Sequence, residues 1–61
     1  MYNKLAWGQK VLIIEIDGQV LDEPIAGVVE NESAWTQDRY WVEYEQGMGG
    51  IWSNRSELKI N

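Results

Sequence analysis

The stretch that decides the fold is RYWVEYEQGMGGIWSNRSELKIN, residues 39–61. Residues 39–45 alternate aromatic or β-branched side chains with polar ones, which predicts a strand. Glycines crowd the next segment, 46–50, and predict a flexible hairpin connection because glycine adopts positive φ without strain. Residues 51–53 and 58–60 predict two more short strands. Between them, Asn54 as an N-cap and Glu57 at the capping-box position predict one helical or 3₁₀ turn.

The residues before this stretch continue the pattern of short strands and turns. After a lead-in at 1–8, we expect strands at 9–16 and 25–30, a turn at Asp17-Gly18, and loops at 19–24 and 31–38. Pro24 marks a strand start or a sheet edge because proline cannot donate to a ladder, and Gly27 is expected at a bend or bulge. Five strands with turns about every 8–12 residues indicate one all-β domain, a sandwich or a barrel.

Strand parity separates a core face from an outer face. In the strand at 39–45, Tyr40, Val42 and Tyr44 share one side and are the natural core. The outer side then carries Trp41 among charged residues, namely Arg39, Glu43 and Glu45.

The strand at 9–16 is apolar on both sides, so one apolar side is left at the surface unless another segment covers it. Exposed apolar patches on a small domain usually mark an interface. We therefore expect a homo-oligomer; the alternative is that residues 1–8 fold back over that side.

Composition excludes several chemistries. The chain has 61 residues with four Trp and three Tyr, and it has no Cys and no His. Disulfides and nucleophilic sites built on Cys or His are therefore absent, and we expect no catalytic residues, no metal and no cofactor. The net charge of −5 argues against nucleic acid and anionic membranes and favours a basic protein partner. No secretion signal or membrane span is evident, so we expect a cytoplasmic protein.

The frame resembles the SH3-like small β-barrel superfamily over nearly the whole chain. The resemblance lies in Trp7-Gly-Gln-Lys-Val-Leu-Ile13, Ala26-Gly-Val-Val29, Tyr40-Trp-Val-Glu-Tyr44, Gly50-Ile-Trp52 and Leu58-Lys-Ile60. It implies a five-stranded barrel, with one short 3₁₀ turn before the last strand, over residues 1–61. Because this barrel hosts many unrelated activities, the resemblance leaves the function open.

Three branches of that superfamily imply different functions. Type II dihydrofolate reductases are similar in the opening Gly8-Gln-Lys-Val11 and in the ending Ser56–Asn61, and they imply an oligomer that acts around a central pore. Their catalytic strand carries Val-Gln-Ile-Tyr, where this chain has Gly50-Ile-Trp-Ser53, so the catalytic residues do not carry over. Peptide-binding SH3 domains are similar only in the strand, turn and strand of 50–58.

Tudor and chromo-barrel domains are the third branch, similar around Tyr40–Tyr44 and Trp52. They imply a reader of methylated Lys or Arg, whose aromatic cage holds the cation by cation–π attraction. The aromatic and acidic residues available for such a cage are Trp7, Trp35, Trp41, Tyr44, Trp52, Asp38 and Glu43.

The leading hypothesis is a non-enzymatic, acidic protein-binding module. Carboxylate pairs such as Glu43 and Glu45 are more often a solvated strand face than a catalytic pair. Trp7 or Trp52 is expected in the core, which leaves the other two Trp for contact. The predicted binding residues are Trp35, Trp41, Glu43, Glu45, Glu30 and Arg39, joined by Glu32 at the acidic edge. Such a module is typical of an accessory or inhibitor protein, viral or encoded by a mobile element, that acts on a basic surface of a host protein.

Overall fold

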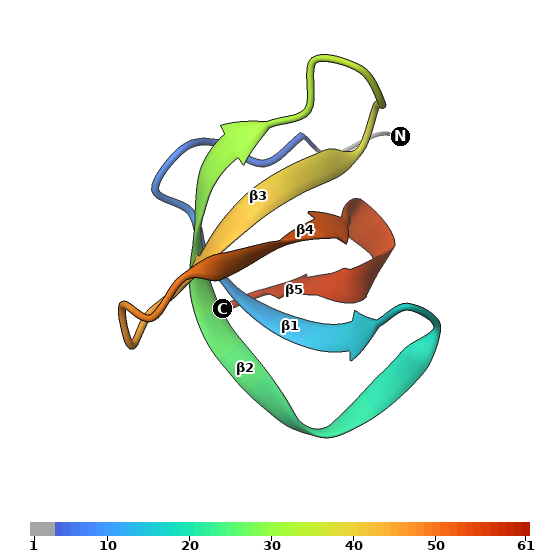
Figure 1. The fold of residues 1–61 in the computed structure, drawn as a ribbon, viewed down its shortest axis with the longest axis vertical. Helices are drawn as coiled ribbons and strands as arrows, with labels where there is room; N and C mark the ends of the chain where they lie inside the picture. The colour runs from blue at the N-terminus through green and yellow to red at the C-terminus, as the bar shows by residue number, and fades with distance from the viewer. Residues whose placement is uncertain (1–3) are drawn as a thin grey trace.

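The computed structural model describes residues 4–61, so the first three residues of the predicted lead-in lie outside the described part of the chain. Its elements are β1 (Lys10–Ile16), β2 (Gln19–Glu32), β3 (Arg39–Tyr44), β4 (Gly50–Asn54), the 3₁₀ helix η1 (Arg55–Glu57) and β5 (Leu58–Ile60) (Figure 1). The strands form one antiparallel sheet in the order β4-β3-β2-β1-β5. The all-β prediction, the five strands and the 3₁₀ turn are confirmed. The sheet curls but is not closed, because β4 and β5 are its two edges.

A two-residue turn joins β1 to β2, as the Asp17-Gly18 pair predicted. Asp17 has φ 50° and Gly18 has φ 82°, and the flanking residues Ile16 and Gln19 are ladder partners. Two successive positive φ values are what a type I′ turn requires, and this turn matches the right-handed twist of the strands. The turn therefore sets the register of the whole β1–β2 hairpin.

β2 is 14 residues long, and the predicted loop at 19–24 is wrong. Gln19 and Val20 continue the hairpin opposite Ile16 and Glu15. The pairing then breaks and resumes at Ile25, which faces Ile13. The unpaired segment between these points ends at Pro24, whose missing N–H is tolerated where no ladder bond is needed.

Gly27 was predicted at a bend or bulge, and the pairing excludes the bulge. It is a regular ladder partner of both Val11 and Tyr44, and the extra residue of β2 is Glu30. A Cβ on Gly27 would lie 2.5 Å from Val42 Cγ1 and 2.9 Å from the carbonyl oxygen of Glu43. Glycine is needed here because β2 and β3 pack too closely for a side chain.

The core lies on the concave side of the curled sheet. It consists of Leu5, Val11, Ile13, Val29, Tyr40, Val42 and Leu58. In β3, Tyr40 and Val42 are fully buried and Tyr44 is half-buried, so the predicted core face is confirmed. Alternation in β1 likewise buries Val11 and Ile13 and leaves Leu12 half-buried on the other side.

Neither Trp7 nor Trp52 belongs to the core, so that prediction is wrong. Trp7 is 76% exposed and Trp52 is 40% exposed. Trp7 sits in a turn that Gln9 N–H closes on the carbonyl of Ala6, and Leu5 fills the core instead. Aliphatic side chains and Tyr40 fill the interior of this small sheet.

The described part of the lead-in folds onto the sheet. Leu5 N–H donates to the buried hydroxyl oxygen of Tyr40 over 3.2 Å, and Gly8 N–H donates to the carbonyl of Val29 over 2.8 Å. Lys4 forms an ion pair of 3.0 Å with Glu32. Leu5 thus joins the core.

Candidate binding surface

Two tryptophans from neighbouring strands form a pair on the outer face of the sheet. Trp41 of β3 and Trp52 of β4 are direct cross-strand partners, so both side chains project to the same side. Their ring centroids are 5.6 Å apart and their planes meet at 65°, an edge-to-face arrangement. Such a pair contributes about 0.5–1.5 kcal/mol beyond its buried area. It holds both indoles in fixed positions at the surface.

The indole of Trp41 leans across the start of β4. A Cβ on Gly50 would lie 3.0 Å from Trp41 Cζ2 and would overlap the carbonyl oxygen of Val42. Gly50 therefore gives the ring a flat backbone surface to lie against. This accounts for the half-burial of Trp41 despite its place on the outer face.

The loop between β2 and β3 presents Trp35, which is 95% exposed. The Ser33 hydroxyl oxygen accepts hydrogen bonds from the backbone N–H groups of Trp35 and Thr36, each over 3.1 Å. Ser33 N–H in turn donates to the carbonyl of Arg39 over 2.8 Å and closes the base of the loop. Short side-chain bonds of this kind define a turn, so Trp35 stands on an ordered support.

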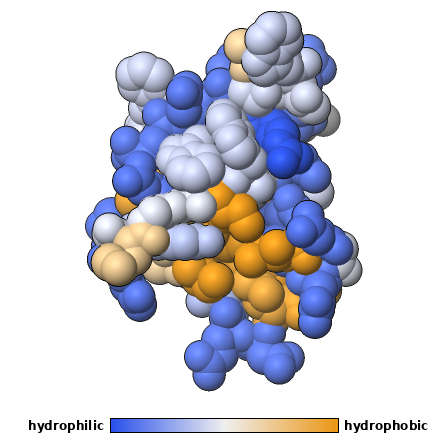
Figure 2. All heavy atoms as spheres, in the orientation of Figure 1, coloured by the Kyte–Doolittle hydropathy of each residue, from blue (hydrophilic) through white to orange (hydrophobic). Residues whose placement is uncertain are grey.

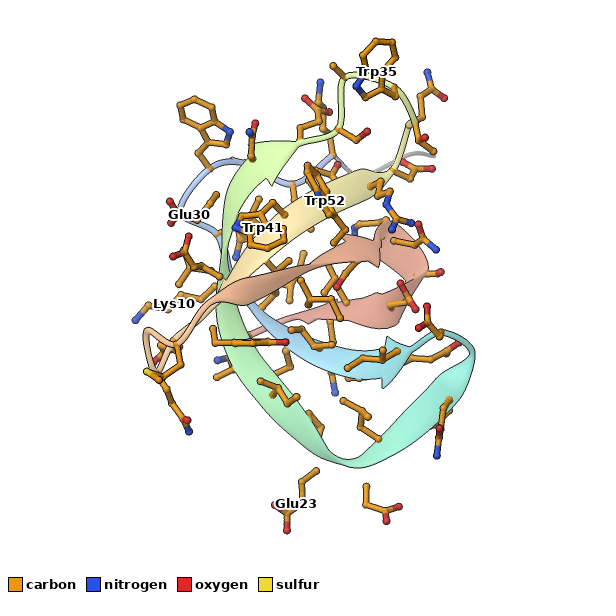
Figure 3. All side chains as sticks on the ribbon, viewed as in Figure 1. Lys10, Glu23, Glu30, Trp35, Trp41 and Trp52 are labelled. Atoms are coloured by element: carbon orange, nitrogen blue, oxygen red, sulfur yellow. The ribbon has the colours of Figure 1, made fainter. Side chains whose placement is uncertain are left out.

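Trp35, Trp52 and Arg39 line one shallow hollow, together with polar residues of the loop. Arg39 Nη1 lies 3.4 Å from the side-chain oxygen of Asn54, which holds the guanidinium between the loop and β4. Figure 3 shows Trp41 and Trp52 together over β3 and β4, with Trp35 beyond them at the loop. We call the surface of Trp35, Arg39, Trp41 and Trp52 the tryptophan face.

The predicted acidic residues divide between this face and its surroundings. Glu43 is exposed on the outer side of β3, two residues from Trp41. Glu30 is the bulged residue of β2 and lies at the margin of the view in Figure 3. Glu45 follows the end of β3, where its N–H donates to the carbonyl of Ala26 over 3.0 Å. Glu32 lines the hollow itself and is ion-paired with Lys4. The structure thus brings Glu32 together with Trp35, Trp41 and Arg39 and leaves the other predicted acidic residues around them.

Trp52 is the member of this face that the leading hypothesis left out, although the aromatic-cage alternative included it. Its place follows from the hairpin between β3 and β4, where Tyr44 N–H donates to the carbonyl of Gly49 over 2.8 Å. Counting outward from these two residues pairs position 41 with position 52. The length of the hairpin therefore contains the information that pairs Trp41 with Trp52, but that pairing can be read from the sequence only when the register of the two strands is known.

Other kinds of site are not apparent in the described residues. Residues 4–61 contain no group of three or more acidic, His or Cys side chains placed to hold a metal ion. Within the same residues, no helix has the length and apolar character needed to cross a membrane. Comparison with known proteins gives no match to a family model, to a curated protein or to a solved structure.

Proposed function

We propose that this chain is a non-enzymatic, acidic protein-binding module whose contact surface is the tryptophan face. The observation that carries the proposal is the 95% exposure of Trp35 on a hydrogen-bonded turn beside Trp52 and Arg39. Trp and Arg are the residue types most enriched among those that dominate binding energy at protein interfaces. The face brings both residue types together on one side of the molecule.

We also propose that the curled sheet is a small barrel of the SH3-like type. The strand order β4-β3-β2-β1-β5 supports this, since η1 leads directly from one edge strand to the other. Figure 1 shows that η1 turns the chain so that β5 lies across the open side from β4. A barrel of this kind presents its outer strands and loops to partners while a small core holds it together.

Charge favours a partner with a basic surface. The chain carries −5 overall, and Glu30, Glu32 and Glu43 are exposed around the tryptophan face. Complementary charge speeds encounter and disfavours acidic partners. We propose an accessory or inhibitor role, in which the module covers a basic site of a host protein. The hollow is lined by both Arg39 and Glu32, and Glu32 is already ion-paired with Lys4, so a methylated cation would meet the like charge of Arg39 beside a carboxylate that already has a cationic partner.

The alternative is that a second copy of the chain binds to the tryptophan face. A matched pair of variants tests whether this face binds either a partner protein or a second copy. Trp35→Ala removes the most exposed indole of the face. Trp7→Ala is the control, because Trp7 is 76% exposed and does not line the hollow. We expect both variants to keep the wild-type unfolding midpoint, because neither side chain is buried.

Sedimentation velocity over a range of concentrations measures self-association, and affinity capture from a host extract identifies heterologous partners. The identified partner is then titrated with the wild-type protein and both variants. We expect Trp35→Ala to weaken the association at least tenfold and Trp7→Ala to leave it unchanged, in keeping with a central aromatic contact. Equal binding by all three proteins would contradict the proposal.

A further inference from the structure

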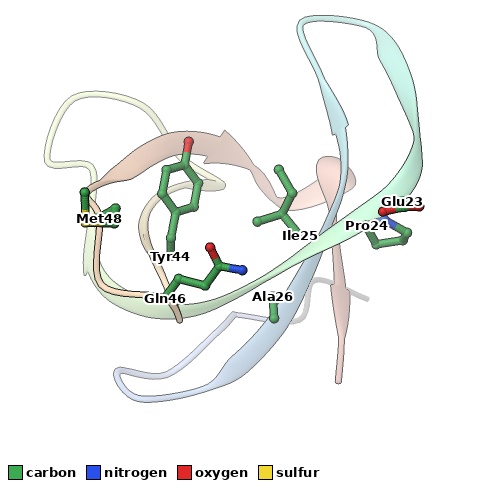
Figure 4. Close-up of a pocket in the computed structure, with 7 residues that line it drawn as sticks. All are labelled: Glu23, Pro24, Ile25, Ala26, Tyr44, Gln46 and Met48. Carbon is green, nitrogen blue, oxygen red and sulfur yellow. The ribbon is translucent and has the colours of Figure 1, made fainter.

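A second hollow lies away from the tryptophan face, where β2 meets the end of β3. Pro24, Ile25 and Ala26 of β2, Tyr44 of β3, and Gln46 and Met48 of the following hairpin line it (Figure 4). Its volume is about 620 Å³, within the range of ligand-binding clefts. Of these residues, the sequence analysis named only Tyr44 as available for binding, as part of an aromatic cage.

The hollow exists because the β1–β2 ladder breaks. Between the pairs Ile13–Ile25 and Glu15–Val20, the four residues 21–24 of β2 stand opposite Ile14 alone. β2 therefore bows away from β1, and Figure 1 shows this bowed part at the foot of the molecule. The bowed segment of β2 leaves a space between β2 and the β3–β4 hairpin.

The walls of this region are apolar and incompletely covered. Two of the lining residues, Ile25 and Tyr44, are half-buried and pack against the core without being enclosed by it. Figure 2 shows hydrophobic side chains gathered over the lower half of this face. Met48, which is 84% exposed, stands on a hairpin whose glycines at 47 and 49 have φ 80° and 99°. The flexible thioether side chain of Met48 can adapt its conformation to a bound ligand.

Negative charge lies at the margin of this apolar space. Glu23 is exposed and lines the hollow, and Asp22 beside it is also exposed. No Lys or Arg is among the described residues that line the hollow. A cation is therefore favoured at this margin.

We infer that this hollow binds an extended peptide segment of a partner protein through a Lys or Arg side chain flanked by apolar residues. The aliphatic stem of such a side chain packs on an apolar wall while its charge reaches a carboxylate at the rim. Here the wall is Ile25, Pro24 and Met48, and the carboxylate is Glu23. The ring of Tyr44 lines the hollow beyond Ile25 and offers an aromatic surface to the apolar residues that flank the cation (Figure 4). This site is distinct from the tryptophan face and does not depend on it.

The test is a titration of ¹⁵N-labelled protein, followed by NMR, with the peptide Ac-Val-Arg-Val-Arg-Val-NH₂. The matched peptide has Gln in place of both Arg. We expect the Arg peptide to shift the amide signals of Ile25, Ala26, Gln46 and Met48. We expect the Gln peptide to bind several-fold more weakly, and added salt to weaken the Arg peptide towards that level.

Two variants locate the charge. Glu23→Gln should weaken binding of the Arg peptide roughly two- to fivefold, the effect of an exposed ion pair. Glu30→Gln is the control, because Glu30 is exposed and lies outside the hollow, and it should change nothing. Equal binding of the two peptides, shifts confined to Trp35 and Trp52, or shifts in this hollow that depend on protein concentration alone would each overturn the inference. The last result would mean that a second copy of the chain occupies the hollow.

Discussion

The backbone N–H of Asp17 donates to Oε2 of Glu57, 3.1 Å away and 40 residues later in the chain. The other carboxylate oxygen, Oε1, accepts from Asn54 N–H over 2.7 Å. Glu57 is only 8% exposed. One buried carboxylate therefore caps η1, as the sequence predicted, and also secures the turn of the first hairpin.

Glu57→Ala should destabilise the protein by about 1.5–3 kcal/mol, because it removes two hydrogen bonds to a charged acceptor and leaves their donors unmatched. Glu57→Gln should lose less, since its amide oxygen still accepts one of them. Urea unfolding followed by Trp fluorescence measures both. Glu30→Ala, at an exposed position, is the control and should stay within about 0.5 kcal/mol of wild type. A similar small value for Glu57→Ala would contradict the bridging role.

Gly27→Ala should destabilise by about 1–3 kcal/mol, the usual range for overpacking. Its new methyl group would meet Val42 Cγ1 at 2.5 Å. Val42→Ala removes that atom at the expense of a core cavity. The double variant should therefore lose less stability than the sum of the two single losses. Strict additivity in this cycle would show that the Val42 contact is not what excludes a side chain at position 27.

Gly18→Ala should cost about 1–3 kcal/mol for a different reason, since its φ of 82° places a side chain in a sparsely populated region while the space around it is open. Asp17→Asn is the matched variant at the other turn position. Asn tolerates positive φ well, and the backbone N–H of residue 17 still donates to Glu57. The stability of this variant should therefore be nearly unchanged. Thermal unfolding by circular dichroism distinguishes the two. Equal losses would argue against the type I′ geometry.

The Trp41–Trp52 contact should appear as a coupling of about 0.5–1.5 kcal/mol in a double-mutant cycle with Trp41→Ala and Trp52→Ala. The edge-to-face geometry gives the reason, since a ring edge lies against the face of its partner. Denaturant unfolding monitored by circular dichroism suits the cycle, because two of the fluorescent residues are removed. A second double-mutant cycle, with Trp35→Ala and Trp52→Ala, is the control. We expect no coupling there, because Trp35 belongs to the loop and not to the edge-to-face pair.

The strands were predictable where alternation and turn residues agree. Val42 lies between the polar or aromatic outer residues of β3, and that spacing alone identified the core face. β2 was underestimated because Asp22, Glu23 and Pro24 have low strand propensity. The Asp17-Gly18 turn already required its next residues to pair with β1. The local propensity of those residues was overridden by the hairpin.

The sites were predictable only in part, for the same physical reason. Trp35 and Trp41 were identified from a polar loop and from strand parity, and they do share a face. Trp52 or Trp7 was expected in the core, whereas the burial of Trp52 depends on its partner across the hairpin. The hollow beside Tyr44 depends on a register break in β2. A single sequence carries no direct signal of that break.

The two bonds accepted by Ser33 have a consequence for recognition. A tryptophan on a loose loop must surrender backbone freedom when a partner arrives, and that entropy loss weakens the complex. Here the turn around Trp35 is already ordered in the free protein. The entropy cost of ordering this turn is met when the protein folds and not when the partner binds. The affinity of this surface therefore depends on the Ser33 hydroxyl, which need not touch the partner.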